Sequence, residues 1–333
     1  MTLALETVHA PSQDHGYIGN LVVAPAGDVF AIGGTYHRPT LLHSSDGGHT
    51  FEPWSVPQAS GLRDVLVDGD RVWIVGEYGI IAHTIDRGAT WQSRKVAATP
   101  CLYSIARDGR GRTWITGDGG LVLRSRGDRF ARVDNHSGTR VLGVWIDPAD
   151  GMPWLYDSGG MLQRWQRKQF VVVALAAMKR TRPLTNLLRT PAGTLIVTAD
   201  DGLILRSSTD GASWKRVAVP TKASFETIAL TPFGIFVVGD RGTLLVSHDD
   251  GKQFRELATG LTSHLWSIAM TDDGVLIGAD AGAIYRLDVP ALAGILRDGH
   301  ARSVISDLAS RVHDGEPGAR LVLEDALRER ELW

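Results

Sequence analysis

One short pattern recurs along most of this 333-residue chain. Its fullest copy, residues 239–254, holds a turn between two glycines, an apolar strand, a second turn with Asp249 and Gly251, and an aromatic residue. The copies end on Phe51, Trp91, Phe130, Phe170, Trp214 and Phe254. These anchors lie roughly 40 residues apart, which is the length of a four-stranded propeller blade. The repeat therefore predicts an all-β chain built from blades.

The number of blades follows from a second recurring element. Each repeat begins with a short strand of the form apolar-x-small-apolar, and seven occur, at 18–21, 62–65, 102–105, 141–144, 184–187, 225–228 and 265–268. They predict a seven-bladed β-propeller over residues 1–288. The seventh unit lacks a fourth strand, and residues 2–9 have strand character. We expect residues 2–9 to close that blade, because an unpaired blade edge would be exposed.

The pattern changes after Asp288. Apolar residues then fall at Val304, Ile305, Leu308 and Val312, which is helical spacing. Residues 289–333 are therefore predicted to form a short α-helical C-terminal tail. Such a tail would cap the propeller, or would serve as a docking or dimerisation element.

The second turn of the repeat resembles a known family motif. It is similar to the Asp-box of bacterial neuraminidase (BNR) repeats, Ser-x-Asp-x-Gly-x-Thr-Trp, carried here by Ser44, Asp46, Gly48, Asp86, Gly88, Trp91, Trp214, Asp249 and Gly251. With a Gly-x-x-Gly turn before each copy, the chain looks most like the photosystem II stability/assembly factor-like family and its bacterial relatives. The resemblance implies that these residues are structural and that the protein helps a complex to assemble. We call segments 44–51, 84–91, 207–214 and 247–254 the box turns.

Composition limits the partners. A formal net charge of −2 gives no reason to expect nucleic acid or an anionic membrane. The single cysteine permits no internal disulfide, and no apolar run is long enough to span a membrane. With no signal-like segment at the start, we expect a cytoplasmic protein. The eleven histidines lack metal-ligand spacing, and phosphate-loop, dinucleotide and nucleophile-elbow motifs are absent from the sequence. We predict no cofactor, no metal and no catalytic residue.

Sialidases share this box, so the enzyme hypothesis needs its own test. A sialidase uses three arginines, a Tyr–Glu nucleophile pair and an Asp acid/base. The nearest approach to its entry motif is Tyr36-His37-Arg38-Pro39, and Glu226 is the only inner-strand Glu near the channel mouth. A non-catalytic scaffold that binds a protein partner is therefore favoured. The alternatives are a sialidase-like glycoside hydrolase, a carbohydrate-binding propeller, and a toxin-neutralising (immunity) partner.

The predicted binding site lies on one face of the ring. The links between second and third strands, and between blades, emerge on the same side, which we call the top face. Two insertions fall there, and the second position of each inner strand, near the channel mouth, varies most. We expect Tyr17, His264 and Trp266 to meet where blade seven joins blade one. The predicted partner-binding residues are Tyr17, Tyr36, His37, Arg38, Arg63, Tyr103, Arg180, Arg182, Glu226, His264 and Trp266. For each one, the alternative is ordinary packing at a blade end.

Two sets of charged residues recur with the period of the blades. One acidic set occupies the turn after the second strand: Glu77, Asp118, Asp200, Asp240 and Asp280, with Asp157 one place off. A cation or basic partner would suit such a ring, but Asp before Gly is also what a tight turn selects. A basic set precedes the box turns or their equivalents: His43, His83, Arg124, Arg164, Arg206 and Arg286. We expect each of these to pair with a carboxylate of its own or the next blade, rather than to bind an anion.

Overall fold

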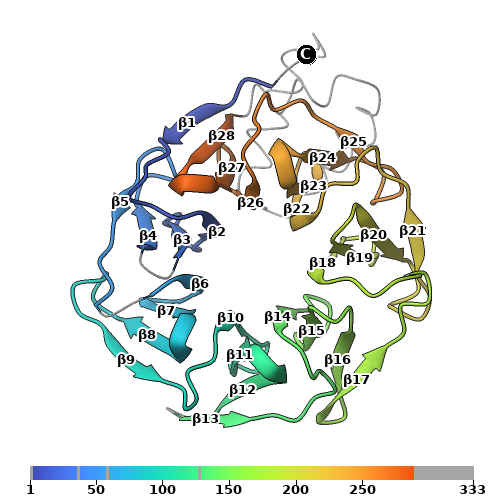
Figure 1. The fold of residues 1–333 in the computed structure, drawn as a ribbon, viewed down its shortest axis with the longest axis horizontal. Helices are drawn as coiled ribbons and strands as arrows, with labels where there is room; N and C mark the ends of the chain where they lie inside the picture. The colour runs from blue at the N-terminus through green and yellow to red at the C-terminus, as the bar shows by residue number, and fades with distance from the viewer. Residues whose placement is uncertain (1–2, 36–37, 58–59, 127–128, 289–333) are drawn as a thin grey trace.

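The computed structural model is an all-β, seven-bladed propeller, and it describes residues 3–35, 38–57, 60–126 and 129–288. Figure 1 shows seven four-stranded sheets arranged around a central channel. Each inner strand faces the channel, and each outer strand lies at the rim. The predicted helical tail at 289–333 lies outside the described residues.

The strands follow the predicted repeat. Blade one is β2 (Ile18–Val23), β3 (Val29–Thr35), β4 (Arg38–Ser44) and β5 (Glu52–Pro53); blade two is β6 (Leu62–Asp68), β7 (Arg71–Gly76), β8 (Ile80–Thr84) and β9 (Gln92–Lys95). Blade three is β10 (Leu102–Arg107), β11 (Thr113–Gly117), β12 (Leu121–Arg126) and β13 (Arg129–Arg132); blade four is β14 (Val141–Ile146), β15 (Pro153–Asp157), β16 (Leu162–Gln166) and β17 (Gln169–Val173). Blade five is β18 (Leu184–Arg189), β19 (Leu195–Ala199), β20 (Leu203–Ser207) and β21 (Lys215–Val217); blade six is β22 (Phe225–Thr231), β23 (Gly234–Gly239), β24 (Leu244–Ser247) and β25 (Arg255–Glu256).

Blade seven is built from both ends of the described chain. It comprises β26 (Leu265–Met270), β27 (Gly274–Ala279), β28 (Ile284–Asp288) and β1 (Glu6–His9). Strand β1 pairs antiparallel with β28, with Glu6 opposite Arg286. The strand is shorter than the expected 2–9 segment, because the chain before it leaves the sheet and Leu3 donates its N–H to Ala258 O of blade six at 2.8 Å. The two strands lie side by side at the rim in Figure 1.

The core lies between neighbouring blades. One buried cluster, for example, joins Phe30, Ile32 and Leu41 of blade one to Leu62 and Val65 of blade two. Because both faces of a blade are covered in this way, the second strand of a blade is buried on both faces rather than on alternate residues. Strand β27 is buried at every position.

Small polar residues join the inner strands across blades. Asn20 Nδ2 donates to Asp64 Oδ1 at 2.6 Å, and Asp64 Oδ2 accepts the N–H of Ile105 at 2.8 Å. The Ser267 hydroxyl donates to Ile18 O at 2.9 Å, which links blade seven to blade one. These bonds explain the small third residue of the apolar-x-small-apolar pattern, because it faces the next strand around the channel.

In a box turn, the acid accepts hydrogen bonds from the residues that follow it, and these bonds fix the loop. Asp46 accepts the N–H groups of His49 and Thr50, both at 3.0 Å, and the Thr50 hydroxyl at 2.6 Å. Gly48 has a φ of 89°, and a Cβ on it would lie 2.4 Å from Leu276 of the preceding blade. Glycine is therefore required there both by its backbone angle and by the close approach.

Two copies of the turn depart from the pattern. In 207–214, Thr209 takes the place of the acid and accepts the N–H of Ser213 at 2.9 Å. In blade four, a two-residue turn replaces the box, with positive φ at Arg167 (48°) and Lys168 (69°). Two consecutive left-handed residues make a tight hairpin turn that matches the twist of its strands.

Candidate functional site

A row of stacked side chains crosses the top face at the mouth of the channel. The Tyr17 and Trp266 ring centroids lie 4.5 Å apart, and Trp266 stacks on His264 at 3.9 Å with 14° between the planes. At one end, Arg63 places its guanidinium carbon 5.6 Å from the Tyr17 centroid. At the other end, His264 Nε2 lies 3.1 Å from Glu226 Oε1. We call these five residues the mouth row, and it spans blades two, one, seven and six.

Tyr17 can take part because of a glycine on the first inner strand. Gly19 occupies the second, variable position of β2, and a Cβ there would lie 2.7 Å from a Tyr17 ring atom. The absence of a side chain therefore lets the Tyr17 ring lie over the strand and reach Trp266. The five members are all partly exposed, so their faces are accessible at the mouth.

The periodic acids hold these side chains in place. Asp280 accepts the Trp266 indole N–H at 2.8 Å and the His264 N–H at 2.9 Å. Glu77 pairs with Arg63 and accepts the N–H of Gly61 at 3.2 Å. The same turn position therefore receives both the backbone before an inner strand and the side chain at its second position.

In the sequence, the acidic set consists of residues that a tight turn selects. The structure shows a different role for most of them. The expected turn role applies to Asp157, whose Oδ1 accepts the N–H groups of Gly159 and Met161 within its own turn. Glu77, Asp118, Asp240 and Asp280 instead begin one-turn 3-10 helices, η1 (Glu77–Gly79), η2 (Asp118–Gly120), η3 (Asp240–Gly242) and η4 (Asp280–Gly282), and reach toward the inner strand. The sequence signal was present in the shared period of the acids and the variable strand position, but their contact depends on the blade geometry.

His264 lies between two carboxylates. Its Nδ1 lies 2.8 Å from Asp240 Oδ1, and its Nε2 faces Glu226. Partial burial opposes a charge on the ring, but the hydrogen bond to Glu226 and the charges of Glu226, Asp240 and Asp280 outweigh it and raise the His264 pKa. Burial and the neighbouring Glu226 and Asp201 also raise the pKa of Asp200.

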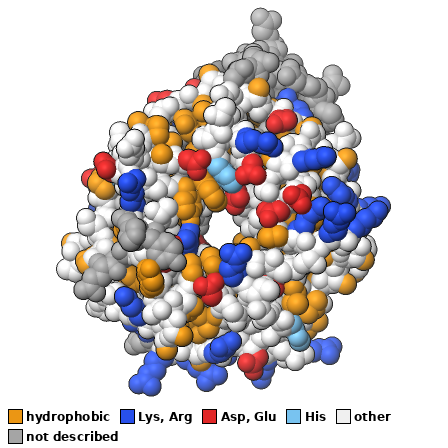
Figure 2. Space-filling view, in the orientation of Figure 1, with side chains coloured by type: hydrophobic (Ala, Val, Ile, Leu, Met, Phe, Trp, Pro, Cys, Tyr) orange, Lys and Arg blue, Asp and Glu red, His pale blue; other side chains and the backbone are white. Residues whose placement is uncertain are grey.

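The space-filling view shows this charge pattern on the surface. In Figure 2, acidic side chains gather around a histidine beside the channel mouth, over the sector of blades six and seven. The Arg63 end of the row lies in blade two. The mouth row therefore runs from a cation, across aromatic faces, to a cluster of carboxylates.

Tyr103 lies in blade three, outside the row. Its hydroxyl donates to Asp118 Oδ1 at 2.9 Å, and Asp118 Oδ2 accepts the N–H of Cys101 at 2.8 Å. Burial and this bond raise the Tyr103 pKa, so the phenol remains a neutral donor. Burial likewise raises the pKa of the Cys101 thiol.

The remaining predicted residues are not brought into the row. Arg38 donates to Gln13 O, Arg180 is exposed, and Arg182 Nε lies 3.1 Å from Asp201 Oδ2. Tyr36 and His37 lie outside the described residues. The structure therefore groups Tyr17, Arg63, Glu226, His264 and Trp266, and places Tyr103, Arg38, Arg180 and Arg182 elsewhere.

His43, Arg164, Arg206 and Arg286 of the basic set form ion pairs, as expected for cations at blade junctions. His43 Nε2 contacts Asp28 of its own blade at 2.8 Å, and Arg164 contacts both Asp150 and Asp210. Arg206 and Arg286 pair with Asp250 and Asp273. Arg124 instead lies over the Trp114 and Trp165 rings.

The described residues contain neither a metal-type cluster nor a membrane-spanning helix. Within them, no group of three or more His, Cys, Asp or Glu side chains is arranged to hold a metal ion. Nor does this part of the chain contain a helix long and apolar enough to cross a membrane.

Sequence comparisons place this chain beside one family. A family model described as photosynthesis system II assembly factor YCF48 matches residues 27–101. The chain is similar to the photosystem II assembly factor family, as its motifs predicted. The chloroplastic stability/assembly factor HCF136 of Arabidopsis thaliana is 26% identical over 97 residues, and that of Oryza sativa subsp. japonica is 28% identical over 97 residues. Each match covers 26% of this chain and 24% or 23% of the relative, so it spans about a quarter of the curated proteins.

Solved structures share the whole ring. YCF48 bound to D1 peptide covers 85% of this chain and 96% of its own, with a TM-score of 0.70 and 21% identity. YCF48 from Cyanidioschyzon merolae has a TM-score of 0.68 at 14% identity, with coverages of 86% and 98%. Virginiamycin B lyase from Staphylococcus aureus reaches 0.72 at 13% identity, with coverages of 86% and 99%. At such identities the likeness shows the fold alone, and one fold serves both binding proteins and enzymes.

Proposed function

We propose that this propeller is a non-catalytic scaffold that binds a protein partner through the mouth row. The observation that carries the proposal is the row itself. It crosses four blades, with partly exposed aromatic faces in blades one and seven, a cation at one end and carboxylates at the other. Tyrosine, tryptophan and arginine are the residues that most often dominate protein interfaces. Arg63 and Trp266 are also held in place by the periodic acids Glu77 and Asp280, which lowers the entropy lost on binding.

The comparisons support the same class of function. The assembly-factor family model matches residues 27–101, within blades one and two, and a structural neighbour of the same ring architecture is bound to a peptide. A partner segment that crosses the mouth would place an acidic group near Arg63 and a basic group near the carboxylates around His264. Protein recognition here would therefore use charge complementarity to fix the orientation of the partner.

Three further parts of the proposal rest on sequence alone. Residues 289–333 are proposed as a second docking or dimerisation element, because of their helical apolar spacing. The box turns are proposed to be scaffold rather than binding residues. The cytoplasmic location stays a prediction.

The experiment compares three forms of the tagged full-length chain in cells that express it natively. The baits are the unaltered protein, a double variant Arg63→Ala/Trp266→Ala, and a control Lys215→Ala on the exposed outer strand β21. We expect one stoichiometric partner to be captured by the unaltered and control baits and lost from the double variant, with the three baits melting alike. Equal capture by the double variant would place the binding surface elsewhere. A parallel assay of the chain against sialosides and aryl glycosides tests the enzyme alternative.

A further inference from the structure

On the face opposite the mouth row, the fourth residue of a box turn meets the basic residue of the preceding blade. Arg164 of blade four contacts Asp210 of blade five at 2.7 Å, and the Arg206 Nε of blade five donates to Asp250 O of blade six at 2.8 Å. Both Asp210 and Asp250 have left-handed φ angles, of 50° and 60°. A cation and an acid therefore close these two junctions between blades.

The junction between blades one and two breaks this pattern. Its box-turn residue is Arg87, with the same left-handed φ of 54°, and its basic residue is His43. Two basic side chains thus occupy the positions that hold a cation and an acid at the junctions of blades four and five and of blades five and six. His43 turns to Asp28 of its own blade at 2.8 Å and stacks on Trp54, with ring centroids 4.4 Å apart.

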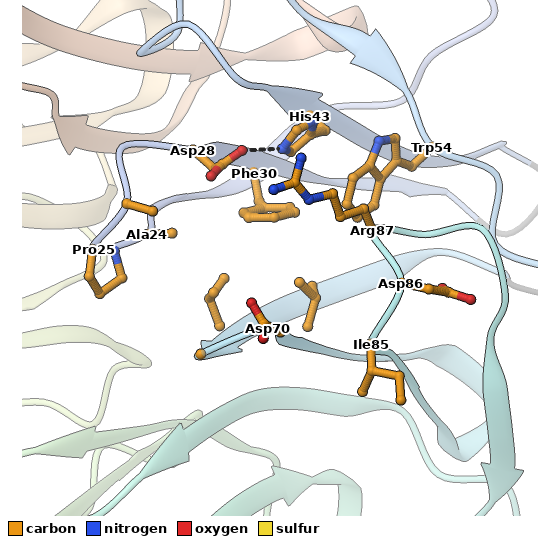
Figure 3. Close-up of a pocket in the computed structure, with 14 residues that line it drawn as sticks. Ala24, Pro25, Asp28, Phe30, His43, Trp54, Asp70, Ile85, Asp86 and Arg87 are labelled. Carbon is orange, nitrogen blue, oxygen red and sulfur yellow. Dashed lines mark hydrogen bonds and ion pairs between the residues drawn. The ribbon is translucent and has the colours of Figure 1, made fainter.

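A cavity of about 630 Å³ lies at this junction. Its apolar walls include Phe30, Trp54 and Val72, and Ile85 at its rim is 61% exposed. Figure 3 shows the Arg87 side chain reaching toward Phe30 and His43, with Asp70 on the other side of the space. The volume lies within the roughly 300–1,000 Å³ typical of small-molecule sites.

The charges around the cavity leave Arg87 available. Among the described residues, no carboxylate lies within ion-pair distance of its guanidinium. Asp28 is engaged by His43, and Asp86 accepts hydrogen bonds from Thr84 and Thr90, which lower its pKa to about 2. Arg87 stands where Asp210 and Asp250 stand in the next blades that keep the pattern, so this junction has cations without the matching acid. An external carboxylate would supply it.

We propose that this cavity binds a small organic monocarboxylate with a flat apolar body. The carboxylate accepts two parallel N–H bonds from Arg87, a geometry that guanidinium favours. The apolar body packs against Trp54 and Phe30, whose rings already meet edge to face at 5.5 Å. Asp28 and Asp70 repel a second carboxylate, so a dicarboxylate of the same size binds more weakly.

The test uses the full-length chain with phenylacetate as the probe, and phenylacetamide as an uncharged probe of nearly the same shape. Binding is measured by calorimetry and by saturation-transfer NMR. We expect phenylacetate to bind and the amide to bind at least about tenfold more weakly, a difference of about 1.4 kcal/mol. Arg87→Gln is expected to weaken phenylacetate binding by about the same factor.

A matched control is available on the other face. Arg241 is also exposed and also left-handed, with a φ of 54°, so Arg241→Gln makes the same change outside the cavity and should leave binding intact. Arg87→Asp recreates the junction chemistry of blades five and six, so it should keep the melting temperature and lose binding even if Arg87→Gln folds poorly. Equal affinity for acid and amide, unchanged binding in both Arg87 variants, or no phenylacetate binding at about 10 mM would overturn the proposal.

Discussion

The Tyr17 ring lies 4.5 Å from the Trp266 ring, so the first and seventh blades share an aromatic contact at the channel mouth. This contact depends on Gly19, because a Cβ at that position would lie 2.7 Å from the Tyr17 ring. An alanine at this position would push the Tyr17 ring aside at low cost to the fold. The displaced ring would no longer contact Trp266. The addition of one carbon at Gly19 on β2 should therefore disturb the mouth row and leave the fold intact.

Gly19→Ala should weaken partner binding by roughly tenfold while lowering the melting temperature by no more than about 4 °C. The control is Gly138→Ala, where a new Cβ meets nothing within 4 Å. Binding is measured by calorimetry with the partner captured by the unaltered bait, and folding by thermal melts followed by circular dichroism. If Gly19→Ala binds as tightly as Gly138→Ala, the Tyr17–Trp266 contact is not part of the interface.

His264 should titrate above the ordinary histidine value, because Glu226, Asp240 and Asp280 favour its charged form. The raised pKa means that the protonated ring stabilises the fold fully below the unfolded value of about 6.5, and that this contribution is lost as the pH rises through the folded pKa. NMR titration of the imidazole measures it directly. Glu226→Gln should lower the pKa, whereas Glu256→Gln on the exposed outer strand should not. A His264 pKa at or below the ordinary value would contradict the pairing of its ring with Glu226 and Asp240.

The fold was predictable because each blade repeats the same local signals. Seven apolar-x-small-apolar strands and the recurring turns determine the number of blades, since each unit must bury both faces against its neighbours. Tyr17, His264 and Trp266 were also predictable as neighbours, because they fall at the first and last inner strands of a closed ring. The contacts of Arg63 and Glu226 with this trio were not, because they depend on side-chain directions across two further blade junctions.

The periodic acids show a different limit of the sequence. Asp before Gly is common in tight turns, so the pattern alone could not distinguish Asp157, which holds its own turn, from Asp280, which holds Trp266 and His264. The cavity at Arg87 was missed for a similar reason. Arg87 occupies the box-turn position of Asp210 and Asp250. This exchange of an acid for a base has meaning only once the box turns are known to pair with the preceding blade.

Asp64 provides a pH test of the inner ring. It is buried between blades and accepts hydrogen bonds from Asn20, Val65 and Ile105, but burial raises its pKa to about 6. The protonated carboxyl is therefore favoured in the folded state. Its stabilising contribution is complete below the unfolded value of about 3.9 and is lost as the pH rises through about 6.

Asp64→Asn removes this titration. We expect the stability difference between the unaltered protein and the variant to shrink by roughly 2–3 kcal/mol between pH 4 and pH 7, measured by denaturant unfolding. Other carboxylates titrate alike in both proteins, so the difference isolates Asp64. A difference that is constant with pH would show that the folded pKa of Asp64 is not raised.

Closure of the ring depends on β1. Its pairing with β28, the bond between His9 Nδ1 and Gly282 O at 2.8 Å, and the packing of Val8 are all lost when residues 1–9 are deleted. We expect the deletion to cost roughly 3 kcal/mol or more, seen as a clear fall in melting temperature. Glu6→Ala, which changes an exposed side chain of the same strand, should melt normally. An unchanged melting temperature after deletion would mean that β1 does not hold the seventh blade.

The aromatic anchors of the box turns should differ in their contribution to stability. Trp214 is 8% exposed, packs in the core between blades four and five, and donates its indole N–H to Gly211 O at 3.1 Å. Trp91 is only half-buried against its cluster. Trp214→Ala should therefore cost about 3–5 kcal/mol, as large-to-small changes in a core do, and Trp91→Ala clearly less. Denaturant unfolding measures both, and partner binding at a temperature where each variant is folded should stay intact. If Trp214→Ala instead lost binding at full stability, the box turns would belong to a binding site rather than to the scaffold.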